Sequence, residues 1–247
     1  MSKSSSDKRH FIIVAVLVVV TTVVMGIVLN GVLELPVAAS VQAHTVDWLF
    51  RVHMWLIAFL FALVSVFMVY SFVVFRRGKR QDEGEHFEGN TTLEILWTAL
   101  PLVAVAVFAY IGVVTLNTVT SAPPDEMVIK VEGAQWLWNF TYPDGTLSTN
   151  ELVVPVDQNL TMQMSSKDVI HDFWVPEWRV KEDVVPGLTT TVHYTTDKTG
   201  EFDMMCNQVC GLNHTLMIAK VKVVTQEEFA TWQQAQLVKQ DLQTASR

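Results

Sequence analysis

The chain has 247 residues, of which half are hydrophobic, and it carries a formal net charge of −8 at pH 7. So large an apolar share is high for a soluble domain of this length and indicates membrane segments. The acidic balance excludes nucleic acid as a natural partner, because its phosphate backbone would be repelled.

Three apolar segments lie in the first half of the chain, and none contains Asp, Glu, Lys or Arg. They run over residues 11–33, 52–75 and 95–116. Each is long enough, at about 1.5 Å per residue, to cross a hydrocarbon core of ~30 Å. A buried helix of a soluble protein can be equally apolar, but three such helices in half a chain fit that alternative poorly. Residues 1–122 are therefore predicted to form a membrane region.

Basic residues predict the orientation of these segments. They cluster before the first segment and after the second, at Lys3, Lys8, Arg9, Arg76, Arg77, Lys79 and Arg80. By the positive-inside rule, both clusters belong on the cytoplasmic side of the membrane. The third segment then leaves on the opposite face, so everything after Asn117 is predicted to be extracytoplasmic.

The first segment has two interpretations. Small residues at positions 37–39 (Val-Ala-Ala) and 41–43 (Val-Gln-Ala) offer cleavage sites for a signal peptidase, which would remove residues 1–39 or so. The apolar run is longer than the usual core of a signal peptide, which favours a retained anchor. Its basic flank suits either interpretation.

Beyond residue 122 the pattern changes to short apolar or alternating runs separated by turn residues. A linker at 121–125 leads to runs at residues 127–131, 136–142, 152–156, 160–164, 189–194 and 218–224. Many short strands with frequent turns predict a β-sandwich or barrel over residues 123–225. The polar stretch 226–244 is predicted to be a surface helix within a C-terminal tail, residues 226–247.

Both cysteines lie in one stretch with the spacing C-x3-C-x3-H-x2-M, which comprises Cys206, Cys210, His214 and Met217. Thiolate, thioether and imidazole together suit copper better than any ion that prefers oxygen. A disulfide or a partial zinc site would use the cysteines, but neither explains Met217. Neither explains His171, which lies upstream in a strand-like run that breaks at a proline. A mononuclear copper site needs one cysteine, so the second allows two sulfurs to bridge two metals.

The cysteine stretch and four other motifs resemble those of subunit II of haem-copper cytochrome c oxidases. The motifs are spread over most of the chain and occur in the same order as in the family. The other motifs are Leu93–Pro101 (LEILWTALP), Gly133–Trp138 (GAQWLW), His171 with the residues after it, and Lys181–Gly187 (KEDVVPG). The resemblance implies a membrane helical hairpin, with a possible N-terminal signal anchor, followed by an all-β cupredoxin-like Greek-key barrel. It also implies a subunit of an oxygen-reducing oxidase in a bacterial-type plasma membrane.

By this resemblance the chain holds a dinuclear copper centre, CuA, which accepts electrons from cytochrome c and passes them to haem in subunit I. The implied ligands are His171, Cys206, the backbone carbonyl of Gln208, Cys210, His214 and Met217. The family commonly has glutamate at the position of Gln208, where the carboxylate binds magnesium. An amide lacks that charge, so magnesium is left out of the predicted site.

Two further residues gain roles from the resemblance. Trp136 aligns with the tryptophan through which the electron enters from cytochrome c, and Glu94 aligns with a glutamate that feeds protons to subunit I. The alternative role for Trp136 is packing, which is also the role we expect for Trp138. The two tryptophans are two positions apart in a predicted strand, so their side chains would point to the same face. The alternative for Glu94 is an interfacial anchor.

Charge favours a cationic electron donor. Residues 1–122 hold 8 basic and 8 acidic side chains, whereas residues 123–247 hold 9 basic and 17 acidic ones. An acidic extracytoplasmic half would attract a basic cytochrome c-type protein, although many soluble domains are mildly acidic. The expected partners are this donor, the haem-bearing subunit I, other oxidase subunits and membrane lipid.

Three other functions remain open. A quinol oxidase subunit II has the same architecture without copper, but the intact ligand set argues against it. A nitrous oxide reductase carries a similar copper loop in a larger enzyme, and three membrane segments in so short a chain count against that function. A membrane-tethered copper carrier is the third.

Overall fold

The computed structural model of the protein describes residues 3–76 and 88–245. The chain forms two compact units. One comprises Met1–Glu34 and Trp48–Gly112, and the other comprises Leu35–Asp47 and Val113–Arg247. Of the basic residues that predict orientation, Arg77, Lys79 and Arg80 lie outside the described residues.

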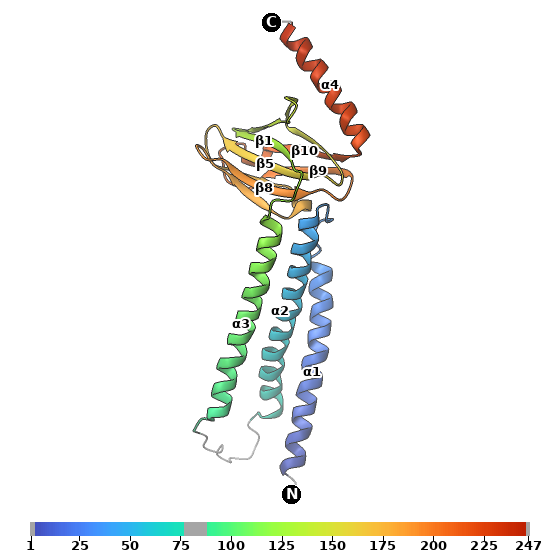
Figure 1. Ribbon diagram of the computed structural model, residues 1–247. Helices are drawn as coiled ribbons and strands as arrows, with labels where there is room; N and C mark the ends of the chain where they lie inside the picture. Colours follow the sequence, from blue (N-terminus) through green and yellow to red (C-terminus); the bar gives the residue numbers. More distant parts are fainter. Residues whose placement is uncertain (1–2, 77–87, 246–247) are drawn as a thin grey trace. The chain divides into compact units, whose positions relative to one another are not determined.

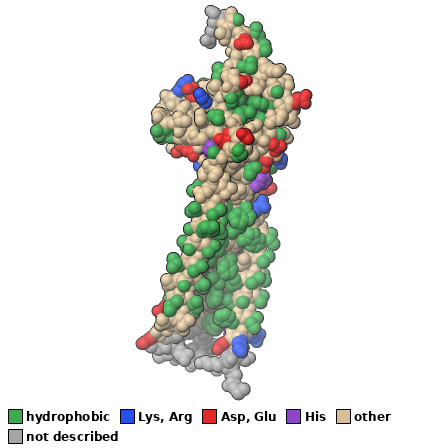
Figure 2. All heavy atoms as spheres, in the orientation of Figure 1, with side chains coloured by type: hydrophobic (Ala, Val, Ile, Leu, Met, Phe, Trp, Pro, Cys, Tyr) green, Lys and Arg blue, Asp and Glu red, His purple; other side chains and the backbone are tan. Residues whose placement is uncertain are grey.

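Three long helices cover the three predicted apolar segments, except for the last residue of the first and of the second (Figure 1). They are α1 (Lys3–Val32), α2 (Val41–Val74) and α3 (Thr91–Thr120). Within the described residues these are the three helices long and apolar enough to cross a membrane. Hydrophobic side chains cover the faces of these helices that Figure 2 shows, as contact with lipid requires. Over residues 3–76 and 88–245 there are thus three membrane-type helices, where the family resemblance implied a hairpin with a possible anchor.

In the part of the second unit that the structure describes, ten strands form two five-stranded sheets. The first sheet has the order β3-β2-β1-β5-β8 and the second has the order β4-β10-β9-β6-β7. The bounds are β1 (Met127–Ala134), β2 (Leu137–Thr141), β3 (Leu147–Thr149), β4 (Glu151–Pro155), β5 (Asn159–Ser166), β6 (His171–Trp174), β7 (Lys181–Val184), β8 (Thr190–Thr195), β9 (Gly200–Cys206) and β10 (Ile218–Val224). The predicted C-terminal helix is α4 (Gln226–Ala245). The prediction of a β-sandwich or barrel in the second half of the chain is confirmed as a domain of two packed sheets.

The sequence analysis did not predict three of the strands, because their amino-acid composition is not typical of strands. β3 has only three residues, and β7 reads Lys-Glu-Asp-Val, so neither shows an apolar run. β9 carries acidic residues at alternate positions before its Met-Met-Cys end. These strands form because the neighbouring strands supply their backbone hydrogen bonds and their few apolar side chains reach the core.

A single hydrophobic core lies between the two sheets. Its largest fully buried side chains include Trp138 and Phe140 from the first sheet and Phe173 and Met204 from the second. The strands alternate buried and exposed residues, so one face of each sheet is apolar. The sheets therefore pack face to face, and the core fixes the strands that carry the cysteine stretch.

The segment that precedes α2, together with the first turns of that helix, belongs to the β unit. Arg179 is central to this attachment: Nε lies 2.8 Å from Oδ1 of Asp47, and Nη2 lies 3.0 Å from Oδ2. Arg179 also donates to the backbone carbonyls of Pro36 and Pro176. Ala39 and Ala43, which end the two candidate cleavage sequences, are fully buried. Residues 36–47 are thus packed into the folded β unit.

Replacing Arg179 by Met tests this attachment. The side chains of Arg179 and Asp47 are only 8% and 11% exposed, so the substitution would leave the buried Asp47 carboxylate without its ion-pair partner. We expect the β unit to lose about 3–5 kcal/mol of unfolding free energy. Lys220→Met is the matched control, because the pair of Lys220 with Asp203 is exposed and should contribute less than about 1 kcal/mol. Denaturant unfolding of the full-length protein would measure both, and equal losses would contradict the assignment.

Candidate metal centre

Strand pairing in the second sheet assembles the predicted metal ligands. His171 begins β6, Cys206 ends β9, and Met217 immediately precedes β10. The strand β9 is antiparallel to both neighbours, with Phe173 opposite Cys206 and Ile218 opposite Met205. Antiparallel strands place the start of one beside the end of the next, so residues about 35 positions apart in the sequence become neighbours.

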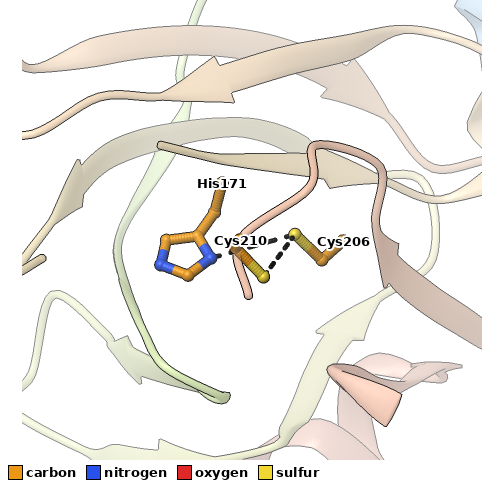
Figure 3. A group of neighbouring side chains, drawn as sticks. All are labelled: His171, Cys206 and Cys210. Carbon is orange, nitrogen blue, oxygen red and sulfur yellow. Dashed lines mark hydrogen bonds between the residues drawn. The ribbon is translucent and has the colours of Figure 1, made fainter. Parts of the chain in front are cut away.

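The two cysteine sulfurs lie at the middle of the cluster, with their Sγ atoms 3.7 Å apart (Figure 3). Nδ1 of His171 lies 3.8 Å from Sγ of Cys206, and Nδ1 of His214 lies 3.6 Å from Sγ of Cys210. Each sulfur therefore faces one imidazole. The donor atoms of His171 and the two cysteines all lie within 4.8 Å of one another, as a shared metal requires.

Two further donors face the same pair of sulfurs. Sδ of Met217 lies 3.8 Å from Sγ of Cys210, and the backbone carbonyl of Gln208 lies 3.3 Å from Sγ of Cys206. Met217 is fully buried, and the two cysteines are almost fully buried. Every residue of the predicted ligand set thus reaches one cluster. The Cys206 amide donates a backbone hydrogen bond of 3.1 Å to the Met217 carbonyl, which joins the two ends of the loop between these residues.

Asp168, which the sequence analysis did not single out, orients His171. Its Oδ1 lies 2.8 Å from Nε2 of His171. Burial raises its pKa, but hydrogen bonds from the Gln135 amide, from His171 and from the Val169 amide outweigh burial and lower the pKa of Asp168 to about 2. An ionised carboxylate only accepts, so it fixes the proton on Nε2 and turns the Nδ1 lone pair towards the cysteines. The available sequence signal was a carboxylate three residues before a candidate ligand.

Trp136 lies in the turn between β1 and β2, so the prediction that it shares a strand and a face with Trp138 is wrong. The hairpin turns where an apolar alternation had suggested a continuous strand. Trp136 is half-buried against the cysteine loop: a Cβ added to Gly211 would lie 3.3 Å from its ring. Nε2 of the neighbouring Gln135 side chain donates to the Cys210 carbonyl at 2.7 Å. This turn therefore holds the loop from outside the second sheet.

Trp138 has the packing role that the sequence analysis kept for it. It is fully buried, and its ring centroid lies 5.8 Å from that of His171 and 6.3 Å from that of Phe173, both edge-on. The Trp138 ring therefore packs against both the proposed ligand His171 and the core residue Phe173. Burial raises the pKa of the Cys210 thiol to about 12, and the neighbouring Cys206 adds to the effect.

The donor set fits a soft metal. Two sulfurs, a thioether and two imidazole nitrogens are the ligands that copper accepts, whereas magnesium and calcium require oxygen. Zinc uses thiolate and imidazole but not thioether. The grouping of Met217 with the cysteines therefore favours copper over zinc.

Glu94 lies in the first turn of α3, in the other unit of the chain. Its Oε1 accepts a hydrogen bond from the Asn90 amide at 3.3 Å, and the Asn90 side chain accepts one from the Leu93 amide at 3.2 Å. This reciprocal pair satisfies amides that the start of a helix leaves without partners. Helix capping is a contribution of Glu94 that the sequence analysis missed.

Three membrane-type helices and a two-sheet domain with a buried His–Cys–Cys cluster define a membrane-anchored protein with a candidate metal site in its β domain. Comparison with known families agrees. The model of the cytochrome c oxidase subunit II transmembrane domain matches residues 28–114, and that of the periplasmic domain matches residues 145–224.

Comparison with individual relatives establishes the family to which the chain belongs. Cytochrome c oxidase subunit 2 of Synechocystis sp. is 30% identical over 246 residues, which cover 80% of this chain and 74% of the relative. The subunit of Thermostichus vulcanus is 30% identical over 252 residues, covering 80% of this chain and 77% of the relative. The chain belongs to the cytochrome c oxidase subunit II family. It is therefore a membrane subunit of an oxidoreductase complex, with an extracytoplasmic domain, in a family that binds copper as CuA.

Solved structures of the family include the periplasmic domain of cytochrome oxidase subunit II of Bradyrhizobium japonicum. That domain is 32% identical, covers 48% of this chain and 99% of its own, and has a TM-score of 0.47. A second structure holds a subunit II domain in a mixed disulfide with a thioredoxin-like protein, at 32% identity and a TM-score of 0.44, covering 48% of this chain and 96% of its own.

Gly211→Ala should loosen the contact between the cysteine loop and the β1–β2 turn. Gly211 has φ +123°, and an added Cβ would lie 2.9 Å from Nε2 of Gln135. Gly145→Ala is the matched control, since it has φ +89° but open space around the added Cβ. Both variants place alanine at a positive φ, so the backbone strain is common to both. Only Gly211→Ala also displaces the Gln135 hydrogen bond, so we expect it to be less stable than Gly145→Ala by about 1 kcal/mol. Thermal unfolding would test the difference; equal stabilities would show that the contact is unimportant.

Proposed function

We propose that this chain is the electron-entry subunit of its oxidase. It accepts electrons from a cationic donor of the cytochrome c class and delivers them towards haem in subunit I, where oxygen is reduced to water. The observation that supports this proposal most is the donor cluster, in which every proposed ligand atom lies 3.3–3.8 Å from a cysteine sulfur.

In this proposal two copper ions are held as a CuA centre by His171, Cys206, the Gln208 carbonyl, Cys210, His214 and Met217. When bound, such a centre would store one electron with little change in geometry, and the thiolates of Cys206 and Cys210 would hold it. The strands β6, β9 and β10 hold the donors in position, and burial of the cysteines keeps water away. The side chain of Gln208 is an uncharged amide, so the copper site is proposed without magnesium at that residue.

The proposed domain division follows from this assignment. Residues 1–122 form the membrane region, residues 123–225 form the copper domain, and residues 226–247 form a polar C-terminal helix. We assign a cupredoxin-like Greek-key barrel to the copper domain. The two packed sheets and the parallel pairs β1–β5 and β4–β10, which require crossover connections between the sheets, support this topology. The membrane is proposed to be a bacterial-type plasma membrane.

The proposed entry point for electrons is Trp136. Its ring lies against Gly211 of the loop between two proposed ligands, while part of it remains accessible. Exposed apolar side chains belong to the same loop: Val209 is 79% exposed and Leu212 is 91% exposed. Exposed apolar groups in a domain with excess negative charge suit a protein partner that is attracted by charge and then packs against the loop.

The proposed role of Glu94 is to gather protons from the cytoplasm and to present them to subunit I. It is exposed at the start of α3, where a carboxylate can reach water. Its hydrogen bond with the Asn90 amide uses one oxygen as an acceptor, so the cap does not require the charge. Capping and proton uptake are therefore separable by substitution.

Cys210→Ser should abolish the two-copper centre, because a hydroxyl cannot bridge metals as a thiolate does. We expect the copper content to fall from two ions per chain and the delocalised electron spin resonance signal to disappear. Met217→Leu should retain copper but shift its redox potential, since thioether is a weak ligand. Met162→Leu, in the buried part of β5, is the control and should change neither. An unaltered two-copper signal in Cys210→Ser would overturn the assignment, and a copper-free wild type would indicate a quinol oxidase subunit.

Trp136→Ala should slow reduction of the copper centre by a cytochrome c donor by about tenfold, equivalent to about 1.4 kcal/mol of barrier. The absorption spectrum of the copper should remain, since Trp136 supplies no ligand. Added salt should weaken docking, because exposed charges are screened over ~8–10 Å at moderate ionic strength. Trp232→Ala, in α4, serves as the control. Stopped-flow mixing would measure all three effects, and rates indifferent to both the substitution and salt would refute the docking model.

Glu94→Ala should lower steady-state oxygen consumption by about tenfold or more, while copper reduction stays normal. Glutamine keeps the oxygen that accepts from Asn90 but cannot carry protons, whereas aspartate can. Glu94→Asp is therefore expected to retain more activity than Glu94→Gln, although glutamine is closer in size. Oxygen consumption and copper reduction should be measured on the same oxidase preparations. Normal turnover in Glu94→Ala would leave this residue with its capping role alone.

A further inference from the structure

A pocket of about 800 Å³ lies between α1 and α2, in the unit of the chain that does not carry the cysteine cluster. The two helices lie side by side and run in opposite directions (Figure 1), because His10 contacts Tyr70 whereas Gly26 lies against Trp55. Pockets of about 300–1,000 Å³ are large enough to enclose a small molecule. The α1–α2 pocket is therefore large enough to hold a ligand.

The α1–α2 pocket is polar at one end only. That end is lined by Asp7 and His10 of α1 and by Tyr70 and Ser71 of α2, and Nδ1 of His10 lies 2.6 Å from the Tyr70 hydroxyl oxygen. The other described lining residues are all apolar, and they continue along α1 as far as Val19. A ligand that matches this lining has one polar end and a long apolar part.

The length of the pocket matches one leaflet of a bilayer. From Asp7 to Val19 the α1 lining extends about 18 Å, at about 1.5 Å per residue. Half of a hydrocarbon core of ~30 Å is similar in depth. The first turns of α2 belong to the β unit, which is extracytoplasmic in this family, so the other end of α2 lies at the cytoplasmic face. The polar end of the pocket therefore faces the cytoplasmic headgroups.

The charges at this end favour an anion. Lys8 and Arg9 immediately precede His10, and Arg76 follows the lining residue Phe75. All three basic side chains are exposed, so they can reach a headgroup at the membrane surface. Among the described lining residues, Asp7 is the one acidic side chain. Three cations outweigh that single carboxylate.

We propose that the α1–α2 pocket binds one anionic phospholipid of the cytoplasmic leaflet, of the phosphatidylglycerol class. Its phosphate lies at the end formed by His10 and Tyr70, and an acyl chain lies along the apolar lining. Basic pockets between membrane helices on the cytoplasmic side bind anionic headgroups in this way. A zwitterionic lipid of the same length would fill the same space but would gain less from the three cations.

The lipid would help to hold α1 in place. The match to the transmembrane domain of the family begins at residue 28, so the α1 side of the pocket, residues 7–19, lies outside the matched region. A lipid that contacts both helices fills the space between them and favours their association. The proposal does not rest on the copper assignment, because the pocket and the cysteine cluster belong to different units.

Native mass spectrometry of the purified full-length protein in detergent tests the pocket. The protein is first freed of lipid and then mixed with phosphatidylglycerol or with phosphatidylcholine. We expect one phosphatidylglycerol per chain. Ala15→Phe should weaken its binding by about tenfold or more, because the ring would occupy the pocket that the small, exposed Ala15 lines. Ala104→Phe is the matched control, since Ala104 is an exposed alanine of α3, and it should bind as the wild type does.

A second pair of variants tests the headgroup. Arg9→Gln should lower the affinity for phosphatidylglycerol about fivefold, the contribution of one cation beside an anionic lipid, and should leave binding of phosphatidylcholine unchanged. The control is Arg51→Gln, because Arg51 is exposed near the other end of α2 and should affect neither lipid.

Three results would overturn the proposal. One is equal binding of the two lipids by the wild type, and another is equal binding of phosphatidylglycerol by Ala15→Phe and Ala104→Phe. The third is an Ala15→Phe variant that binds lipid normally but no longer purifies with the other oxidase subunits, which would assign the pocket to a helix of a partner. Selective loss of phosphatidylglycerol in Ala15→Phe and Arg9→Gln supports the lipid site.

Discussion

The antiparallel pairing of β9 with β6 on one side and with β10 on the other is the constraint on which the metal centre depends. It places the end of β9 at Cys206 beside the start of β6 at His171 and the start of β10 after Met217. The hydrophobic core between the sheets holds this register, because a slip of one residue would turn every buried side chain outward. Packing of the core thus positions the strands that carry the donors.

Two kinds of chemistry lie on either side of the loop that begins at Cys206. On one side the two cysteine sulfurs and the His171 imidazole are buried close to Trp138 and Met217, which gives a dry environment suited to soft ligands. On the other side Asp172 and Asp183 line an oxygen-rich hollow. Adjacent residues of a strand point to opposite faces, so His171 and Asp172 serve these two environments in turn.

The attachment of residues 36–47 to the β unit bears on the first apolar segment. Ala39 donates its amide to the Glu177 carbonyl at 3.0 Å, and the Gln42 side chain accepts from the Thr195 amide at 3.0 Å. Both candidate cleavage sequences thus contribute to the folded β unit. Removal of residues 1–39 would take away the Pro36 carbonyl that Arg179 contacts, together with the Ala39 amide.

The sequence by itself determined the membrane segments, the β character of the second half and the residue types of the candidate site. These follow from local rules: apolar length, alternation, and the softness of Cys, His and Met as ligands. It missed β7 and β9, whose charged residues hide their strand character, and it placed Trp136 in a strand rather than in the turn against Gly211. Only the tertiary structure revealed Asp168 behind His171 and the ion pair of Arg179 with Asp47. Each of these depends on strands or segments that pair across long stretches of chain, and such pairing is decided by packing of the whole core rather than by any local pattern.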